Sequence, residues 1–184
     1  ILSLTFCCSF LLVNSSTAQD QDRVTEIETR LRVLDRLIQT KPYSLQKEVD
    51  SLRIESRELG SVRNRIMASL VLSKSYELQK DYTSAYAYID SAFAIAESSD
   101  YDALDYMLNY RKGFTLIQQG ENARAIESLN VARDIAEAAG NEGARAQAIL
   151  NLGAAYTKLG DLQKAISALD EAGNIYRATD DQRG

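Results

Sequence analysis

The residue types that most often carry out chemistry in proteins are scarce in this chain. Its 184 residues contain no histidine, so the commonest acid–base group and the commonest metal ligand are missing. The two cysteines, Cys7 and Cys8, are adjacent and lack the spacing of a zinc site or a redox pair. Carboxylates are plentiful, for example at Glu121, Glu127, Asp134 and Glu137. We expect them to form a solvated helix face, because no apolar surroundings isolate a pair for acid–base work.

Catalytic and cofactor-binding motifs are missing as well. The sequence has no glycine-rich phosphate loop, no Gly-x-Ser-x-Gly turn and no pair of metal ligands at helical spacing. Its net charge of −5 offers no long-range attraction to nucleic acid or to an anionic membrane. The residues therefore predict a protein that is not an enzyme, needs no cofactor or metal and does not bind nucleic acid.

The elements that must position the remaining side chains are helices with a repeating pattern. The chain has 1 proline and 9 glycines, and alanine, leucine, glutamate, glutamine and arginine recur throughout. Small and apolar residues recur forty positions apart in four series. The series are Ala85, Ala125 and Ala165; Ala92, Ala132 and Ala172; Ile89, Leu129 and Leu169; and Ser73, Gly113 and Gly153. Similarity at a fixed period of this kind is typical of a solenoid.

This period divides the chain into units of two helices each. We expect a degenerate capping hairpin over 19–60, three repeats over 61–100, 101–140 and 141–180, and the start of a further repeat at 181–184. In the last repeat the second helix is expected to pack through a stripe formed by Leu162, Ala165, Ile166, Leu169 and Ala172. Gly160 can end one helix in the left-handed conformation, and Asp161 can cap the next.

The residues Leu152-Gly153-Ala154-Ala155-Tyr156, then Gly160-Asp161, then Ala165, Leu169 and Ala172 resemble the tetratricopeptide repeat. The usual period of that family is roughly 34 residues. The forty-residue units here are similar to the long-helix variety common in bacterial sensory and regulatory proteins. This resemblance implies an all-α, right-handed superhelical solenoid whose concave groove, lined by the first helix of each unit, binds peptides or protein segments.

The candidate groove residues are those on the first helices that are offset from the packing stripe. They are Lys74, Tyr110, Arg111, Phe114, Gln147, Asn151 and Lys158. Asn151 stands where the family often uses an asparagine to hold a ligand's backbone, and no asparagine occupies the equivalent place in the two preceding repeats. Tyr110, Arg111 and Phe114 belong to types enriched at binding hot spots. The alternative interpretation is that these residues contact the neighbouring unit or water.

The first eighteen residues have the composition of a targeting signal. They carry no charge, and the largely apolar run from Ile1 to Val13 is 13 residues long, shorter than the roughly 20 needed to span a bilayer. Ser16-Thr17-Ala18 fits signal peptidase cleavage before Gln19. We therefore expect a cleaved signal peptide and a location that is periplasmic or otherwise extracytoplasmic in a bacterium. The alternative is a retained membrane-anchoring helix, and the absence of an initiator Met suggests a fragment.

Two functions from different classes fit this organisation. In the first, the chain is a non-enzymatic scaffold that binds a protein or peptide. In the second, it is the exported sensory region of a larger bacterial signalling enzyme, a diguanylate cyclase or histidine kinase, whose membrane helix and catalytic domain would lie downstream. A hydrophobic run of about 20 residues followed by a catalytic domain in the downstream sequence would favour the second.

Overall fold

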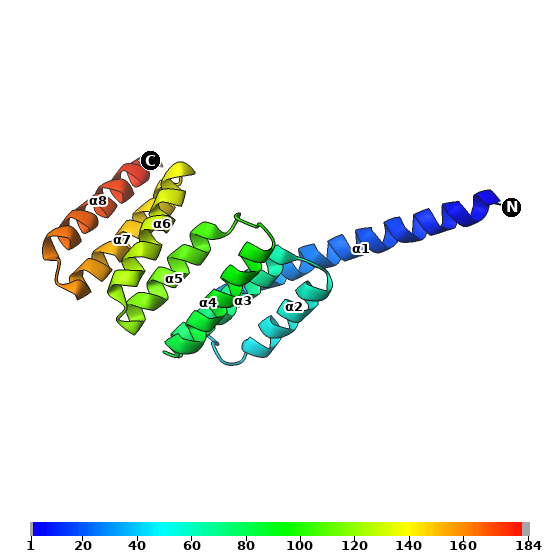
Figure 1. The fold of residues 1–184 in the computed structure, drawn as a ribbon, viewed down its shortest axis with the longest axis horizontal. Helices are drawn as coiled ribbons and strands as arrows, with labels where there is room; N and C mark the ends of the chain where they lie inside the picture. The colour runs from blue at the N-terminus through cyan, green and yellow to red at the C-terminus, as the bar shows by residue number, and fades with distance from the viewer. Residues whose placement is uncertain (1, 182–184) are drawn as a thin grey trace.

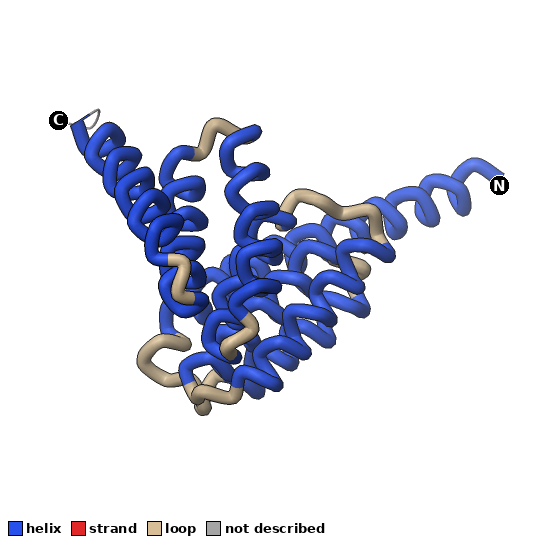
Figure 2. Tube along the Cα trace, turned by 60° about the vertical axis from the view of Figure 1, so that its left-hand side comes forward, coloured by secondary structure: helices blue, strands red, loops and turns tan. Residues whose placement is uncertain are grey.

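The computed structural model describes the backbone of residues 2–181 and the side chains of residues 17–179. The described residues form eight α-helices and no strand, which confirms the predicted all-α fold. The helices are α1 (Leu2–Leu37), α2 (Gln46–Glu58), α3 (Val62–Leu78), α4 (Tyr82–Ser98), α5 (Asp105–Gln119), α6 (Asn122–Ala138), α7 (Glu142–Leu159) and α8 (Leu162–Asp181). They stack in chain order from α1 to α8 as four successive hairpins (Figure 1; Figure 2).

From the end of α2 onward the helix ends recur every twenty residues, and each connection contains a residue in the left-handed conformation. These residues are Gly60 (φ 67°), Lys80 (φ 62°), Asp100 (φ 49°), Gly120 (φ 84°), Gly140 (φ 63°) and Gly160 (φ 81°). The left-handed conformation turns the chain sharply after a helix and satisfies carbonyl groups of its last turn. Glycine adopts this conformation without steric cost, whereas a residue that carries a side chain is strained in it.

Several of the next helices begin with a side-chain cap, which satisfies a backbone N–H that has no partner inside the helix. The Ser61 hydroxyl accepts from the backbone N–H of Asn64 at 3.4 Å. A carboxylate oxygen of Asp81 accepts from the N–H of Ser84 at 3.0 Å. The Asn141 side chain accepts from the N–H of Ala144 at 3.1 Å. A left-handed residue followed directly by a cap therefore reverses the chain at the start of α3, α4 and α7.

The left-handed Lys80 provides a test of this turn geometry. Its side chain is exposed, and its backbone has a φ of 62°. We expect Lys80→Gly to raise the free energy of unfolding by about 0.5–1 kcal/mol, because relief of backbone strain exceeds the added entropy of the unfolded chain. Chemical denaturation followed by circular dichroism measures the change. Lys80→Ala is the control, since it removes the same side chain but keeps the strain, and an equal gain from it would contradict the explanation.

The repeated small residues lie where the two helices of a hairpin approach each other most closely. Ala85 and Ala125 are 0% exposed and Ala165 is 3% exposed. A Cβ atom added to Gly113 would lie 2.5 Å from Cγ of Leu129, and one added to Gly153 would lie 2.9 Å from Cγ of Leu169. Both distances are too short for carbon atoms, so α5 and α7 require a residue without a side chain at these places.

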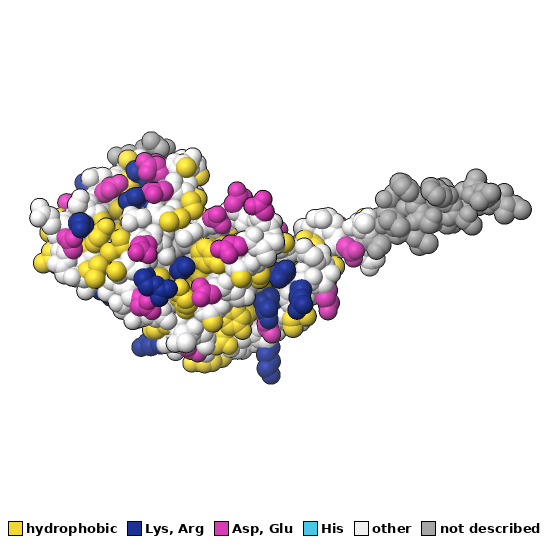
Figure 3. All heavy atoms as spheres, in the orientation of Figure 1, with side chains coloured by type: hydrophobic (Ala, Val, Ile, Leu, Met, Phe, Trp, Pro, Cys, Tyr) yellow, Lys and Arg dark blue, Asp and Glu magenta, His cyan; other side chains and the backbone are white. Residues whose placement is uncertain are grey.

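One predicted packing stripe is only half buried. Ala165 and Ala172 of α8 are buried, but Leu162, Ile166 and Leu169 are 62%, 61% and 43% exposed. Leu129, the equivalent of Leu169 in the preceding unit, is 0% exposed, because Leu152 and Ala155 of α7 pack in the same cluster. No further helix of the described residues covers α8, and apolar side chains therefore remain at the surface at that end of the stack (Figure 3).

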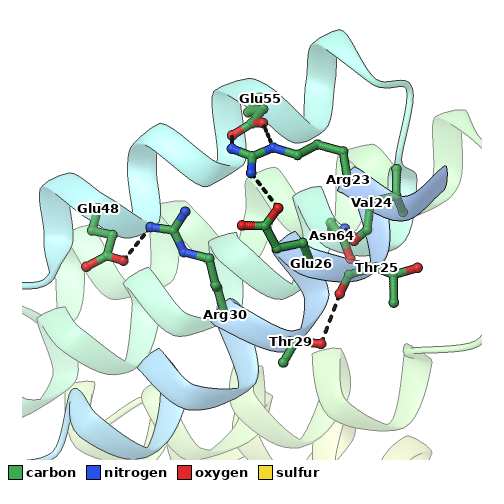
Figure 4. A network of polar contacts seen from close by, with 9 residues as sticks. All are labelled: Arg23, Val24, Thr25, Glu26, Thr29, Arg30, Glu48, Glu55 and Asn64. Atoms are coloured by element: carbon green, nitrogen blue, oxygen red, sulfur yellow. Dashed lines mark hydrogen bonds and ion pairs between the residues drawn. The ribbon is translucent and has the colours of Figure 1, made fainter. Parts of the chain in front are cut away.

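The N-terminal helix α1 completes the first hairpin through both apolar and polar contacts. Ile27 and Leu31 are buried in a cluster with Leu52 of α2 and Leu72 of α3. Around this cluster, Arg23 binds the carboxylates of Glu26 and Glu55, Arg30 contacts Glu48 at 2.7 Å, and the Asn64 amide donates to the Val24 carbonyl at 2.8 Å (Figure 4). These contacts hold α1 against both α2 and α3.

The predicted signal segment falls mostly on residues whose side chains lie outside the described range. The backbone of α1 is continuous through the predicted cleavage point between Ala18 and Gln19. Within the described part of the chain, no helix combines the length and the apolar character needed to cross a membrane.

Candidate functional site

Two hollows lie side by side on the surface formed by the first helices of the units, α1, α3 and α5. We call this surface the first-helix face. The first hollow, the α1–α5 pocket, has a volume of about 330 Å³. It is lined by Arg32, Asp35 and Arg36 of α1, by Arg63, Met67, Leu70 and Val71 of α3, and by Leu104 and Met107 at the start of α5. It is thus an apolar floor with a charged rim.

The second hollow, the α3–α5 pocket, has a volume of about 260 Å³ and lies further along α3 and α5. Its lining residues are Lys74, Glu77 and Leu78 of α3, Tyr82 of α4, and Arg111, Phe114 and Gln118 of α5. Three of the seven predicted groove residues, Lys74, Arg111 and Phe114, therefore line one pocket. These three residues meet because they lie off the packing stripe and because α3 and α5 are neighbours in the stack.

A series of alternating charges crosses the first-helix face at the α3–α5 pocket. The Lys74 ammonium lies 2.8 Å from a carboxylate oxygen of Asp35 on α1. On the other side of Lys74, Glu77 lies 2.7 Å from the Arg111 guanidinium and accepts a hydrogen bond from the Thr115 hydroxyl. The side chains of Glu77 and Arg111 are only 6% and 17% exposed. The pair is therefore largely removed from water, and each charge depends on the other.

The environment of Glu77 shifts its proton affinity. Burial raises the pKa of the Glu77 carboxyl above its usual range, while Arg111, Thr115 and Lys74 oppose that shift without cancelling it. Burial also raises the pKa of Tyr110, and it raises the pKa of the stacked Tyr106 to about 12. The ring centroids of these two tyrosines lie 5.8 Å apart. Both phenols are thus neutral hydrogen-bonding groups at neutral pH.

The predicted residues nearer the C-terminus connect the third and fourth units. The Asn151 amide donates to the Tyr110 hydroxyl at 3.0 Å, and the Lys158 ammonium donates to the Ile117 carbonyl at 3.1 Å. Gln147 is exposed on α7. Among the described residues, Gln147 is the one of these four predicted residues whose side chain makes no hydrogen bond or ion pair with a neighbouring unit. A ligand would have to compete with the neighbouring unit for Asn151, Tyr110 and Lys158.

The contribution of α1 to this surface was not predicted from the sequence. Arg32 and Arg36 lie one turn apart on α1 and reach the rim of the α1–α5 pocket. The first hairpin lacks the repeated alanines, so the register of its outward side chains was not visible in the repeat pattern. A signal was nevertheless present in Met67 and Met107, which are forty residues apart and both line the pocket.

A third hollow, of about 240 Å³, lies at the connection between α4 and α5 and is rich in carboxylates, including Glu97, Asp100, Asp102 and Asp105. Within the described part of the chain, no group of three or more histidine, cysteine, aspartate or glutamate residues is placed to hold a metal ion. We therefore take the first-helix face, with its two adjoining pockets, as the candidate site.

Comparison with protein-family models finds tetratricopeptide repeats over residues 105–178. This range covers α5 to α8 almost entirely. Comparison with curated proteins gives no significant match.

Comparison with solved structures finds BtubC (BKLC) from P. vanneervenii, with a TM-score of 0.70 and 20% sequence identity. The aligned region covers 82% of this chain but only 63% of that protein. At this identity the likeness concerns the fold alone, and it extends the helical-repeat architecture to most of the chain.

Proposed function

Residues 105–178 match the tetratricopeptide-repeat model, and on this premise we propose that the chain is a non-enzymatic scaffold that binds a protein or peptide through its first-helix face. Tetratricopeptide repeats are helical interaction modules, and the family is generally non-catalytic. The observation that supports this particular face is the pair of adjoining pockets on α3 and α5. Solenoids present many side chains at regular spacing along one surface, which suits an extended or helical partner.

The composition of the two pockets suits a protein segment. Exposed or half-buried apolar side chains, such as Met107 and Phe114, alternate with charged groups such as Arg36 and Lys74. A partner segment could place apolar side chains in the pockets and polar groups on the rims, as in protein interfaces generally.

Site-specific photo-crosslinking tests the proposal. A benzoyl-phenylalanine is introduced in place of Phe114 on the first-helix face, or in place of the exposed Val131 on α6 as the matched control. In extract of the source organism we expect a crosslinked partner from position 114 and none from position 131. A partner captured only from position 131 would place binding on the second helices and would contradict the proposal.

The export of the protein is a separate proposal, supported by the exposure of the described residues around the predicted cleavage point. Residues 17–22 are exposed, whereas Ile27 is the first fully buried side chain of α1 among the described residues. A helix beginning at Gln19 would carry Asp20 and Asp22 in its first turn, where negative charge is favourable. These features suit removal of the segment and a location outside the bacterial cytoplasm.

We expect a chain that begins at Gln19 to unfold with a free energy within about 0.5 kcal/mol of the full chain, because no described core contact is lost. A chain that begins at Glu28 should be clearly less stable, since it lacks Ile27 and the Arg23–Glu55 ion pair. Denaturant titrations measure both. N-terminal sequencing of the protein from the producing cell would contradict the export proposal if residues 1–18 are recovered intact.

A further inference from the structure

The α1–α5 pocket has an electrostatic character opposite to that of the whole chain. The protein carries a net charge of −5, but the pocket's rim holds three guanidinium groups, Arg32, Arg36 and Arg63, and one carboxylate, Asp35. That carboxylate is already paired with Lys74 at 2.8 Å. The local excess of positive charge therefore comes from arginines gathered from two helices that are far apart in sequence.

The three arginines differ in how far the protein itself satisfies them. Arg32 lies 2.7 Å from Glu28, and Arg63 contacts the same carboxylate at 3.2 Å and the Tyr101 hydroxyl at 3.3 Å. Arg36 is exposed and makes no hydrogen bond or ion pair with the described residues. Glu28 thus has two cations to neutralise, and Arg36 has no counter-ion of its own. An anionic group from outside would meet little competition at this rim.

The floor of the pocket determines what such an anion must be attached to. Leu70 and Val71 are 5% and 4% exposed and form its base, while Met107, which is 43% exposed, forms its edge. Methionine side chains are unbranched and polarisable, so Met67 and Met107 can adapt to apolar groups of different shape. The volume of about 330 Å³ accommodates an apolar side chain rather than an anion alone.

From this arrangement we propose that the α1–α5 pocket selects acidic partner segments, in which carboxylates flank an apolar side chain. The proposal rests on the function proposed above and names the chemistry of the partner. The apolar side chain lies between Met67 and Met107, and a neighbouring carboxylate forms a two-point hydrogen-bonded pair with the Arg36 guanidinium. A basic segment is rejected by the unpaired arginine, which makes charge the main source of selectivity.

Selection from a displayed library of random 12-residue peptides tests this proposal with the full chain as bait. We expect the enriched peptides to be acidic and to contain at least one large apolar residue. Enrichment of basic or uncharged peptides, or no enrichment, would overturn the proposal. The affinities of the enriched peptides, measured by fluorescence anisotropy, should fall as the salt concentration rises, because the rim charges are solvent-exposed.

Two matched variants locate the binding. Arg36→Glu should lower the affinity of the chain for the enriched peptides at least tenfold. Arg57→Glu makes the same charge change on α2, at an exposed arginine that also lacks an ion pair with the described residues, and should change the affinity less than twofold. Equal effects of the two variants would mean that only the overall charge matters and would overturn the assignment to the pocket. Thermal melts of both variants confirm that the fold is kept.

These experiments distinguish a failure of the acidic-segment proposal from a failure of the proposed function. If position 114 crosslinks a partner but Arg36→Glu leaves binding of that partner unchanged, the first-helix face is an interaction surface and the α1–α5 pocket does not select for acidity. If position 114 captures nothing and the selection enriches nothing, both proposals fail.

Discussion

Replacing Glu77 with alanine is expected to lower the free energy of unfolding by about 3–5 kcal/mol, because it leaves the Arg111 guanidinium charged, largely buried and without its counter-ion. The two side chains are 6% and 17% exposed and lie 2.7 Å apart. The Thr115 hydroxyl, which is itself fully buried, also loses its acceptor. The Nε of Arg111 already lacks a hydrogen-bond partner, so the variant has few ways to compensate. Denaturant-induced unfolding followed by circular dichroism gives the change directly.

A double variant separates the charge from the packing. Glu77→Met combined with Arg111→Met removes both charges and keeps apolar bulk, and its stability should recover to within about 1–2 kcal/mol of the wild type. If Glu77→Ala alone costs less than about 1 kcal/mol, the pair is not isolated from water as described.

The raised pKa of the Glu77 carboxyl determines the direction in which this group makes the stability depend on pH. A folded-state pKa above the unfolded value of 4.5 means that the native state binds this proton more tightly than the unfolded chain does. The stability that comes from this tighter proton binding is therefore fully present below pH 4.5 and is lost as the pH rises through the raised folded-state pKa, above which the ion pair with Arg111 remains. The depressed carboxyl pKa values of Asp81 and Asp161 act in the opposite direction, because their contribution is lost as the pH falls. Comparing pH–stability profiles of the wild type and Glu77→Gln isolates the first effect.

The second large effect is expected from Ala125→Glu, which should cost about 4 kcal/mol or more or should unfold the third and fourth units outright. Ala125 is 0% exposed, and it packs in one cluster with Leu129 of its own helix and Leu152 of α7. A carboxylate there has neither room nor a partner. Urea titration followed by circular dichroism, with limited proteolysis to map the unfolded segment, is the measurement.

Ala123 provides the matched control, because it lies two residues before Ala125 on the same helix, about half a turn away, and is exposed. Ala123→Glu should change the free energy of unfolding by no more than about 0.5 kcal/mol. Similar stabilities for the two variants would show that the repeated alanines do not mark the contact between the helices of a hairpin.

The fold class could be predicted from the sequence because its determinants are local and repeated. The alanines forty residues apart occupy one geometric position, the close approach within a hairpin, so a single-chain pattern was sufficient to indicate helical hairpins. The pattern could not reveal that Lys80 and Asp100 adopt the left-handed conformation that glycine adopts elsewhere. It also could not reveal that Leu162 and Ile166 stay exposed, since burial at a solenoid end depends on what packs there rather than on the residue type.

The candidate site was predictable only in its general location. Lys74, Arg111 and Phe114, which were predicted from their offset from the packing stripe, line one pocket. However, long polar side chains on neighbouring helices can also reach one another, and Asn151, Tyr110 and Lys158 do so. Whether such a side chain faces a ligand or the next unit is decided by interatomic distances of a few ångströms, which a repeat pattern does not contain. The binding role of all seven predicted residues stays a prediction.

The side-chain hydrogen bonds described above have a short and uniform reach along the chain. Those between neighbouring first helices join residues 35 to 41 positions apart, as in the Arg63–Glu28 and Asn151–Tyr110 contacts, and among the described residues none reaches further. Each unit is therefore fastened only to the one before and the one after it. A gene encoding such a chain can gain or lose a whole forty-residue unit by duplication or deletion, and every surviving unit still finds neighbours of the same kind. The length of the first-helix face, and with it the length of partner that it can accommodate, is thus open to evolution by recombination without any change in the rules of packing.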